Sequence, residues 1–138
     1  MAGDLSNYAE GEIIKHIFRT GSFTKPTSLY VALFTTMPDK ESGTGGTEVS
    51  GGSYARVQVG PSDATWDAPT VGGDTANTAA ITFPAPTANW GTILGFGVYD
   101  ASTSGNMLFS ASLTASKTVN NGDPAPNFPI GDLTFTLD

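Results

Sequence analysis

The sequence is marked first by what it lacks. None of its 138 residues is cysteine, which excludes disulfides, thiolate nucleophiles, zinc–thiolate sites and iron–sulfur clusters. No apolar run approaches the ~18 residues needed to span a bilayer. The first residues carry neither a basic segment nor an apolar one, so no export signal is visible. We therefore expect a soluble chain that has no membrane partner.

Basic charge and histidine are also scarce. Six Lys and Arg stand against 13 Asp and Glu, a formal net charge of −7. Counterion release from a phosphate backbone cannot drive binding of so acidic a chain, which disfavours nucleic acid as a partner. His16 is the one histidine, and no Gly-x-Ser-x-Gly nucleophile motif accompanies it. Composition thus favours a structural or binding role over an enzyme and indicates no cofactor.

Turn-forming residues are what the chain has in abundance, with 17 Gly and 9 Pro. A chain of this length has room for one domain around one hydrophobic core, so we expect residues 1–138 to form a single domain. Residues 37–53 are too polar and too rich in glycine to pack a core. We expect this segment to be a mobile loop unless a partner orders it.

One helix is predicted, at about residues 6–20, where apolar side chains recur with a 3.6-residue period. Asn7 and Glu10 have the spacing of a capping box, and Gly21 stands where a left-handed C-cap would end the helix. The apolar face, which includes Ile13 and Ile17, is expected to cover one end of a sheet. Docking on a partner subunit is the alternative.

Strand patterns fill the rest of the chain, at residues 29–35, 53–59, 77–83, 92–101, 106–113, 116–119 and 133–137. Residues 29–35 are apolar on both faces, as in a central strand that is covered on both sides. The short polar segment 102–105 predicts a hairpin between its neighbours. Seven or eight such strands predict a mainly β fold: an antiparallel β-sandwich, jelly-roll-like, or a flattened barrel.

Few side chains suggest chemistry. The acidic residues lie mostly in turns, where carboxylates commonly cap the backbone. The turn at 120–123 and the loop at 100–106 offer oxygen ligands for Ca²⁺, but neither has the spacing of an EF-hand. Trp66 and Trp90 stand beside Pro and Gly turns, so we keep them as candidate surface aromatics for stacking on a sugar. Trp90 is also the candidate to lie against the bare backbone of the two glycines in 92–101.

Several segments in a fixed order resemble a family of small tailed-bacteriophage structural proteins, usually labelled tail fibre proteins. They are 5–10 (LSNYAE), 29–35 (LYVALFT), 46–56 (GTEVSGGSYAR), 81–84 (ITFP), 90–93 (WGTI), 105–109 (GNMLF), 116–123 (SKTVNNGD) and 131–138 (GDLTFTLD). The resemblance spans nearly the whole chain. It implies a protein of the virion surface, made in the host cytoplasm, and carries no catalytic residues with it.

The resemblance and the size together favour a capsid decoration (cement) protein, because 138 residues of β-sandwich leave no length for a fibre shaft. A tail fibre component, a tail-tip component or a glycan-binding adhesin module is the alternative. The expected partners are the major capsid protein or tail proteins, and a homo-oligomer such as a trimer. The side chains that we expect to contact a partner are Ile13, Ile17, Glu48, Tyr54, Arg56, Trp66 and Trp90.

Overall fold

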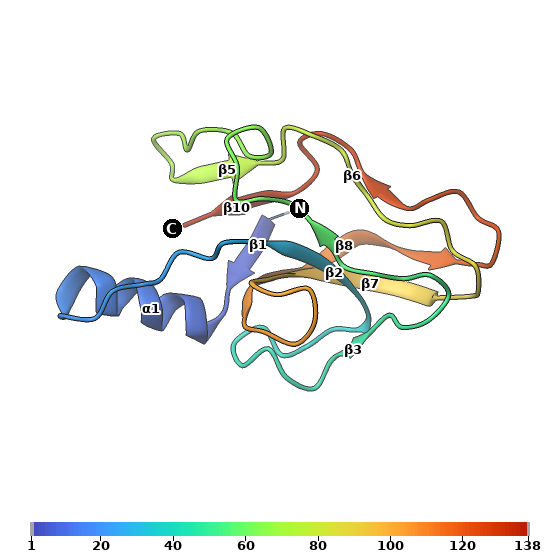
Figure 1. The fold of residues 1–138 in the computed structure, drawn as a ribbon, viewed down its shortest axis with the longest axis horizontal. Coiled ribbons are helices and arrows are strands. Elements are labelled where there is room, and N and C mark those ends of the chain that lie inside the picture. Colours follow the sequence, from blue (N-terminus) through green and yellow to red (C-terminus); the bar gives the residue numbers. More distant parts are fainter. Residues whose placement is uncertain (1, 138) are drawn as a thin grey trace.

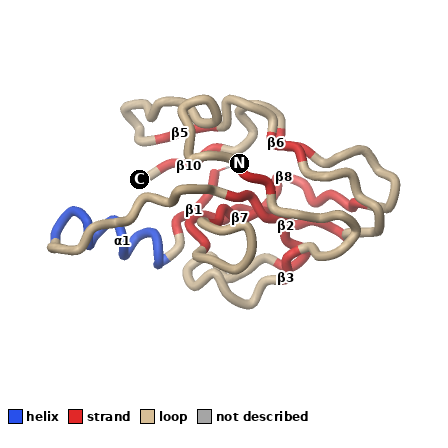
Figure 2. The backbone as a smooth tube through the Cα atoms, in the orientation of Figure 1, coloured by secondary structure: helices blue, strands red, loops and turns tan. Residues whose placement is uncertain are grey.

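The computed structural model describes residues 2–137, and ten strands and one helix occur in that range (Figures 1 and 2). The elements are β1 (Ala2–Leu5), α1 (Asn7–Phe18), β2 (Tyr30–Thr36), β3 (Thr47–Glu48), β4 (Val57–Gln58), β5 (Asp74–Ala76), β6 (Ile81–Thr82), β7 (Gly91–Tyr99), β8 (Met107–Val119), β9 (Asn127–Phe128) and β10 (Thr134–Thr136). The prediction of a mainly β fold with one N-terminal helix is confirmed. The strand number exceeds seven or eight because several strands are only two residues long.

The strands form two layers in a sandwich-like arrangement, with β2, β7 and β8 in one layer and β5, β10 and β6 in the other (Figure 1). The long sheet has the order β3-β2-β7-β8-β1-β10-β5, with β4 also on β2, and β6 pairs with β9 in a separate ladder. The long sheet ends at β3 and β5, so it does not close into a barrel. Pairing is antiparallel except between β1 and β10.

Strand β1 carries the long sheet from one layer to the other. Its second half pairs with β8 through Asp4 and Leu5, and its first half pairs in parallel with β10 at residues 134 and 135. Periodicity did not reveal this four-residue strand, because it is too short to show an alternation before the helix begins. Ser6 is therefore the only residue between β1 and α1, and it is the N-cap of the helix.

Aromatic side chains fill the space between the layers. Phe96 of β7 is fully buried, and its ring packs edge to face on Phe128 of β9 at 5.5 Å and on Phe135 of β10 at 6.2 Å between centroids. Central strand β2 is buried on both faces, as predicted. Its second face, with Phe34 and Ala32, packs with Tyr99 and Met107 in a smaller cluster.

Segment 37–53 covers that second cluster, which corrects the prediction of a loop unable to pack. The side chain of Met37 packs against the cluster and lies so close to Gly95 that a Cβ there would overlap its sulfur. The segment also contributes β3, which pairs with β2, and Val49, which is 5% exposed in the main core. Scattered apolar residues are enough to seat the loop, although their spacing has no regular period.

The N-cap of the helix lies one residue before the predicted cap, and the helix ends without a glycine. Ser6 is the N-cap, and its Oγ accepts a hydrogen bond from Ala9 N at 3.3 Å. Arg19 takes an extended conformation at the C-terminal end, so Gly21 is not the C-cap. The predictions that Asn7 caps the helix and that Gly21 ends it are both wrong, because a Ser side chain and an extended turn already satisfy the helix ends.

Two further strand predictions need correction. Residues 106–113 and 116–119 belong to one continuous strand, β8, which is 13 residues long. Of the predicted strand at 77–83, only Ile81–Thr82 forms a strand, β6. Asn77, at the start of the predicted range, is 1% exposed. Its Nδ2 donates to Ala79 O and Pro129 O at 2.8 and 2.9 Å, and its Oδ1 accepts from Leu133 N at 2.9 Å. The predicted hairpin between β7 and β8 is confirmed.

Candidate functional site

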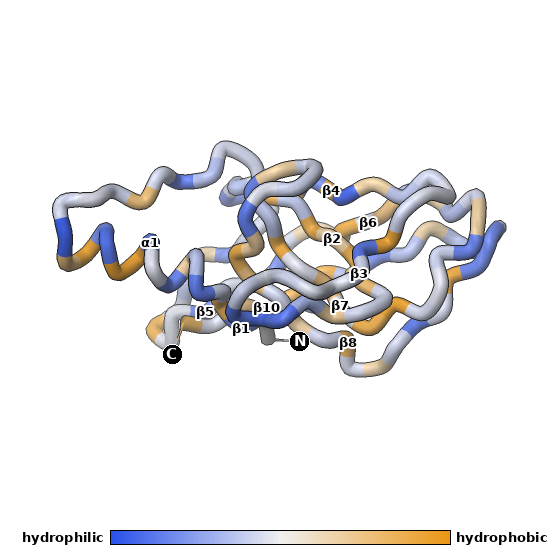
Figure 3. Tube along the Cα trace, turned by 90° about the horizontal axis from the view of Figure 1, so that it is seen from below, coloured by the Kyte–Doolittle hydropathy of each residue, from blue (hydrophilic) through white to orange (hydrophobic). Residues whose placement is uncertain are grey.

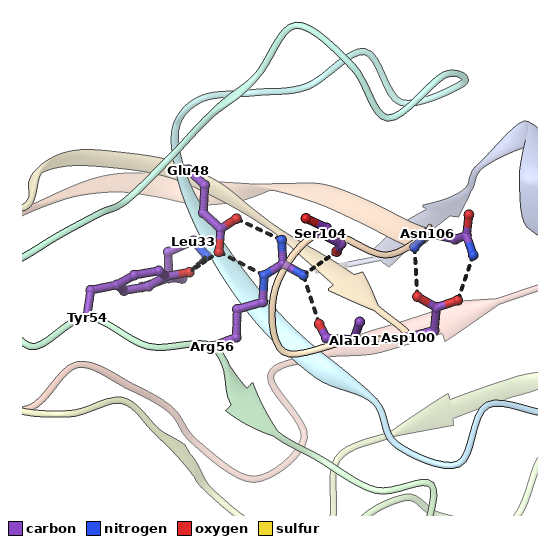
Figure 4. Close-up of polar contacts among 8 residues, drawn as sticks. All are labelled: Leu33, Glu48, Tyr54, Arg56, Asp100, Ala101, Ser104 and Asn106. Carbon is purple, nitrogen blue, oxygen red and sulfur yellow. Dashed lines mark hydrogen bonds and ion pairs between the residues drawn. The ribbon is translucent and has the colours of Figure 1, made fainter.

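Three of the expected contact residues, Glu48, Tyr54 and Arg56, lie together as the arginine cluster (Figure 4). Arg56 donates from Nε to Glu48 Oε1 at 2.9 Å and from Nη2 to Oε2 at 2.8 Å, a bidentate pair. The Tyr54 hydroxyl donates to Glu48 Oε1 at 2.9 Å and accepts from Leu33 N at 2.9 Å. Tyr54 and Arg56 are two residues apart in the predicted strand 53–59, so they share one face of it, and the structure turns both side chains inward.

The arginine cluster holds a loop in place. Arg56 Nη1 donates to Ala101 O and to Ser104 O, each at 2.8 Å, and so binds the β7–β8 hairpin loop. Its guanidinium also lies 3.9 Å from the centroid of the Tyr99 ring. The Arg56 side chain is only 6% exposed and that of Glu48 is 28% exposed. The cluster is therefore an internal brace between segment 37–53, β4 and the hairpin, with little surface to offer a partner.

Burial sets the ionisation of this cluster. It raises the pKa of the Tyr54 phenol well above its ordinary value, and the neighbouring Glu48 carboxylate adds to that rise. Burial also raises the pKa of Tyr99. Burial alone would lower the pKa of Arg56, but the hydrogen bonds and charge of Glu48 outweigh it and the net direction is upward. None of these three side chains has a proton to exchange near neutral pH, which suits a structural role.

Turn carboxylates cap the backbone, as predicted. Asp100 accepts from Asn106 N at 2.7 Å and from Asn106 Nδ2 at 2.8 Å (Figure 4). Asp123 accepts from Asn120 N at 2.7 Å. Within residues 2–137, no three His, Asp or Glu side chains gather as a metal site would require. Asp100 and Asp123, the acids of the two segments considered for Ca²⁺, thus hydrogen-bond within their own turns.

The two tryptophans differ. Trp90 is 5% exposed, its Nε1 donates to Gly52 O at 2.9 Å, and its ring packs edge to face on Tyr54 at 5.4 Å. The prediction of Trp90 as a surface aromatic is wrong, because the core takes up its ring and the turn at Gly52 takes up its N–H. It does not lie on the strand glycines either: Phe34 and Tyr99 approach Gly97.

Trp66 remains partly exposed. Its Nε1 donates to Val59 O at 2.7 Å, and its ring meets Phe135 edge to face at 5.5 Å. It also lines an open hollow of about 740 Å³ with Lys25, Pro61, Ser62, Asp63, Asp67, Ala68 and Pro69. Sequence analysis missed the two aspartates of this hollow, because turn acids are common and nothing in their spacing sets them apart.

Helix α1 projects from one end of the sandwich, and residues 19–29 return beside it (Figure 1). Ile13 lines a groove of about 250 Å³ between this returning segment and the end of the sheet, with Leu5, Ala9, Phe23, Leu29 and Phe109 among its other walls. Ile17 is 63% exposed and Phe18 is 76% exposed. The expectation that the helix covers the end of a sheet holds only for Ala9, the one fully buried side chain of α1.

His16 is held locally. Its Nδ1 accepts a hydrogen bond from Phe23 N at 3.2 Å, which helps the returning segment to follow the helix. Within residues 2–137, no helix is both long and apolar enough to cross a membrane.

The comparison with protein families matches almost the entire chain. The model of a family described as podophage GP4 fiber I protein gp80 covers residues 4–136. The chain belongs to this family. Membership confirms the resemblance to phage tail fibre proteins and places the protein in the virion as a phage structural protein that associates with other virion proteins. No curated protein matches the chain.

Proposed function

We propose that this protein is a component of the phage tail fibre apparatus. The observation that carries the proposal is the fibre-family match over residues 4–136. Capsid decoration was predicted from size and the lack of a shaft, and both features suit a small globular unit of a fibre equally well. The family description therefore favours the alternative reading, a fibre component, over decoration.

The arrangement of the molecule supports an attachment role without catalysis. The arginine cluster and the capped turns stabilise one end of the sandwich, while α1 projects from it (Figure 1). The carboxylates of Asp100 and Asp123 accept hydrogen bonds from the backbone of their own turns. A rigid body that presents a helix with exposed apolar side chains is suited to contact with other virion proteins.

Gold-labelled antibody against the chain on purified virions, viewed by electron microscopy, tests the proposal. We expect label on the tail fibres, with none on virions treated with pre-immune antibody. Uniform label over the heads would contradict the fibre role and restore capsid decoration. As a control for epitopes that the antibody cannot reach in intact virions, heads and tails are separated and labelled individually. We expect label on the tail fraction only.

The hollow at Trp66 favours a second candidate function, contact with a host-surface polysaccharide. It joins a partly exposed indole, suited to stacking on a sugar ring, with the carboxylates of Asp63 and Asp67, which accept hydrogen bonds from hydroxyls. We expect Asp63→Ala to weaken saturable binding to host polysaccharide. Glu41→Ala, which removes an exposed acid elsewhere, is the control, and equal binding by the two variants would count against this candidate.

A further inference from the structure

Large exposed apolar side chains gather on α1. The exposed fractions are 40% for Tyr8, 54% for Ile14, 63% for Ile17 and 76% for Phe18. The other large exposed apolar residues, such as Val71 and Ile130, are scattered over separate loops and strands. In Figure 3, hydrophobic (orange) and hydrophilic (blue) stretches alternate along the projecting helix. A single exposed apolar residue is ordinary, but a cluster on one projecting helix indicates a contact surface.

Four residues of α1 form one stripe on the side turned away from the groove. Asn7, Gly11, Ile14 and Phe18 follow one another at intervals of four, three and four residues. This spacing places side chains along one line of a helix and is the spacing by which paired helices meet. Three of the four residues are exposed and Gly11 is half-buried, so nothing in the described chain covers the stripe.

Gly11 has no reason in its own chain to be glycine. A Cβ built there would have no atom within 4 Å, and its φ is not positive. Glycine inside a helix costs about 1 kcal/mol relative to alanine. Close approach of another backbone or a large side chain would explain its presence. The stripe already suggests that such a neighbour comes from outside the chain.

The stripe is complementary to itself when two copies run antiparallel. Because the intervals read the same in both directions, Phe18 of one copy meets Asn7 of the other, and Ile14 meets Gly11. Each large side chain then faces a small one, as knobs face holes in paired helices. A parallel pair would set Phe18 against Phe18 and leave Gly11 against Gly11.

Charge favours the same orientation. The first half of α1 carries Glu10 and Glu12, and the second half and its C-cap carry Lys15 and Arg19. An antiparallel pair places the acidic half of each copy beside the basic half of the other and also opposes the two helix dipoles. We propose that a second copy of this chain docks on α1, antiparallel, along Asn7, Gly11, Ile14 and Phe18. This pairing goes beyond the proposed fibre role and does not depend on it.

The pairing is modest in size. A helix of 12 residues is about 18 Å long, so two such helices bury less than the roughly 800 Å² per partner that is typical of a stable complex. We therefore expect a dimer with micromolar affinity in solution. Multiple copies held close together in a virion would raise its occupancy through effective concentration.

Sedimentation of the full chain over a wide concentration range is the first test. We expect a monomer–dimer equilibrium that Phe18→Glu weakens at least about tenfold, since a charge would replace the most exposed apolar contact. Ile130→Glu is the matched control, because Ile130 is 67% exposed and lies far along the chain from α1. A monomer at every concentration would overturn the proposal and point to a different virion protein as the occupant. Equal weakening by the two variants would also overturn it.

Gly11→Ala separates the pairing from a folding effect. The substitution should raise the thermal stability of the monomer, since alanine favours the helix and the space is open within one chain. It should nevertheless weaken dimerisation, because the added methyl group lies where Ile14 of the second copy packs. Unchanged or stronger dimerisation in Gly11→Ala would contradict the proposed geometry.

Cross-linking tests the orientation. The chain contains no cysteine, so an introduced thiol gives an unambiguous product. Tyr8 and Lys15 flank the same side of the stripe, and in an antiparallel pair each lies near the other residue of the second copy. Mixing Tyr8→Cys with Lys15→Cys under mild oxidation should give mainly the mixed disulfide. Absence of the mixed disulfide would overturn the antiparallel proposal.

Discussion

The arginine cluster and α1 reverse the usual distribution of polar and apolar side chains. At the cluster, the Arg56 side chain is only 6% exposed, and its guanidinium binds the Glu48 carboxylate and two backbone carbonyls. The same carboxylate accepts a hydrogen bond from the Tyr54 hydroxyl. On α1, Phe18 is 76% exposed and Ile17 is 63% exposed. Buried charge is tolerated where every polar group finds a partner, and exposed apolar surface persists where no part of the chain folds over it.

This difference teaches that the sandwich is complete without the helix. Among residues 2–137, no buried side-chain nitrogen or oxygen lacks a hydrogen-bond partner. The main core draws its buried residues from the strands and loops, and none from α1. The stability of the fold therefore resides in the sandwich, and the outer face of α1 is free to serve association.

The largest expected effect concerns the core. Trp90→Ala should lower the free energy of unfolding by about 3–5 kcal/mol, because it removes a ring that is 5% exposed and the hydrogen bond from its Nε1 to Gly52 O. Urea unfolding followed by circular dichroism measures the change. A loss below about 1 kcal/mol would mean that the ring lies at the surface after all, and that the contrast between the sandwich and the helix is weaker than the structure indicates.

Breaking the arginine cluster should have the next largest effect. Glu48→Ala leaves the Arg56 guanidinium buried without its carboxylate, so we expect a loss of about 3 kcal/mol. Arg56→Met removes the charge together with its pairing requirement and serves as the comparison in a double-mutant cycle. A coupling free energy close to zero between positions 48 and 56 would mean that the ion pair behaves as a solvent-exposed one and does not stabilise the fold.

Alkaline pH should lower the free energy of unfolding through the buried tyrosines of the sandwich. Burial raises the pKa of Tyr54 and Tyr99 in the folded chain, so the folded state retains protons that the unfolded state loses above about pH 10. Stability is then fully present below pH 10 and falls as pH rises, by up to about 1.4 kcal/mol per pH unit for each such group. Unfolding of Tyr54→Phe, measured between neutral pH and pH 11, should show a shallower fall than the parent chain.

The smallest expected effect lies on the helix. Phe18→Ser should change the free energy of unfolding of the monomer by no more than about 0.5 kcal/mol, because the ring contacts solvent in the single chain. Unfolding at low protein concentration, where association is absent, is the measurement. A loss of several kcal/mol would show that α1 belongs to the core and would remove the contrast between the two regions.

Local patterns predicted much of the fold. The alternation and apolar runs at 29–35, 92–101 and 133–137 correspond to β2, β7 and β10, and the short polar loop at 102–105 predicted the hairpin. Strands β1, β3, β5 and β9 were missed because they have only two to four residues. Such strands exist through pairing with distant segments, and no local periodicity records that pairing.

The expected contact residues fared unevenly for a related reason. Ile13 and Ile17 lie on the projecting helix, where the 3.6-residue period of apolar side chains predicted them. Glu48, Tyr54 and Arg56 meet one another instead of a partner, and Trp90 is buried. A polar alternation shows that one face differs from the other, but it does not show which face another part of the chain will cover.

The sequence by itself determined the β class, the single helix, the acidic surface and the membership of a phage fibre family, because composition, periodicity and ordered motifs are local properties. Only the tertiary structure decided that Trp90 is buried and Trp66 is partly exposed, that segment 37–53 covers a second core, and that α1 is left uncovered. Those outcomes depend on contacts between residues far apart in the chain, and burial is decided by which distant surfaces fit together.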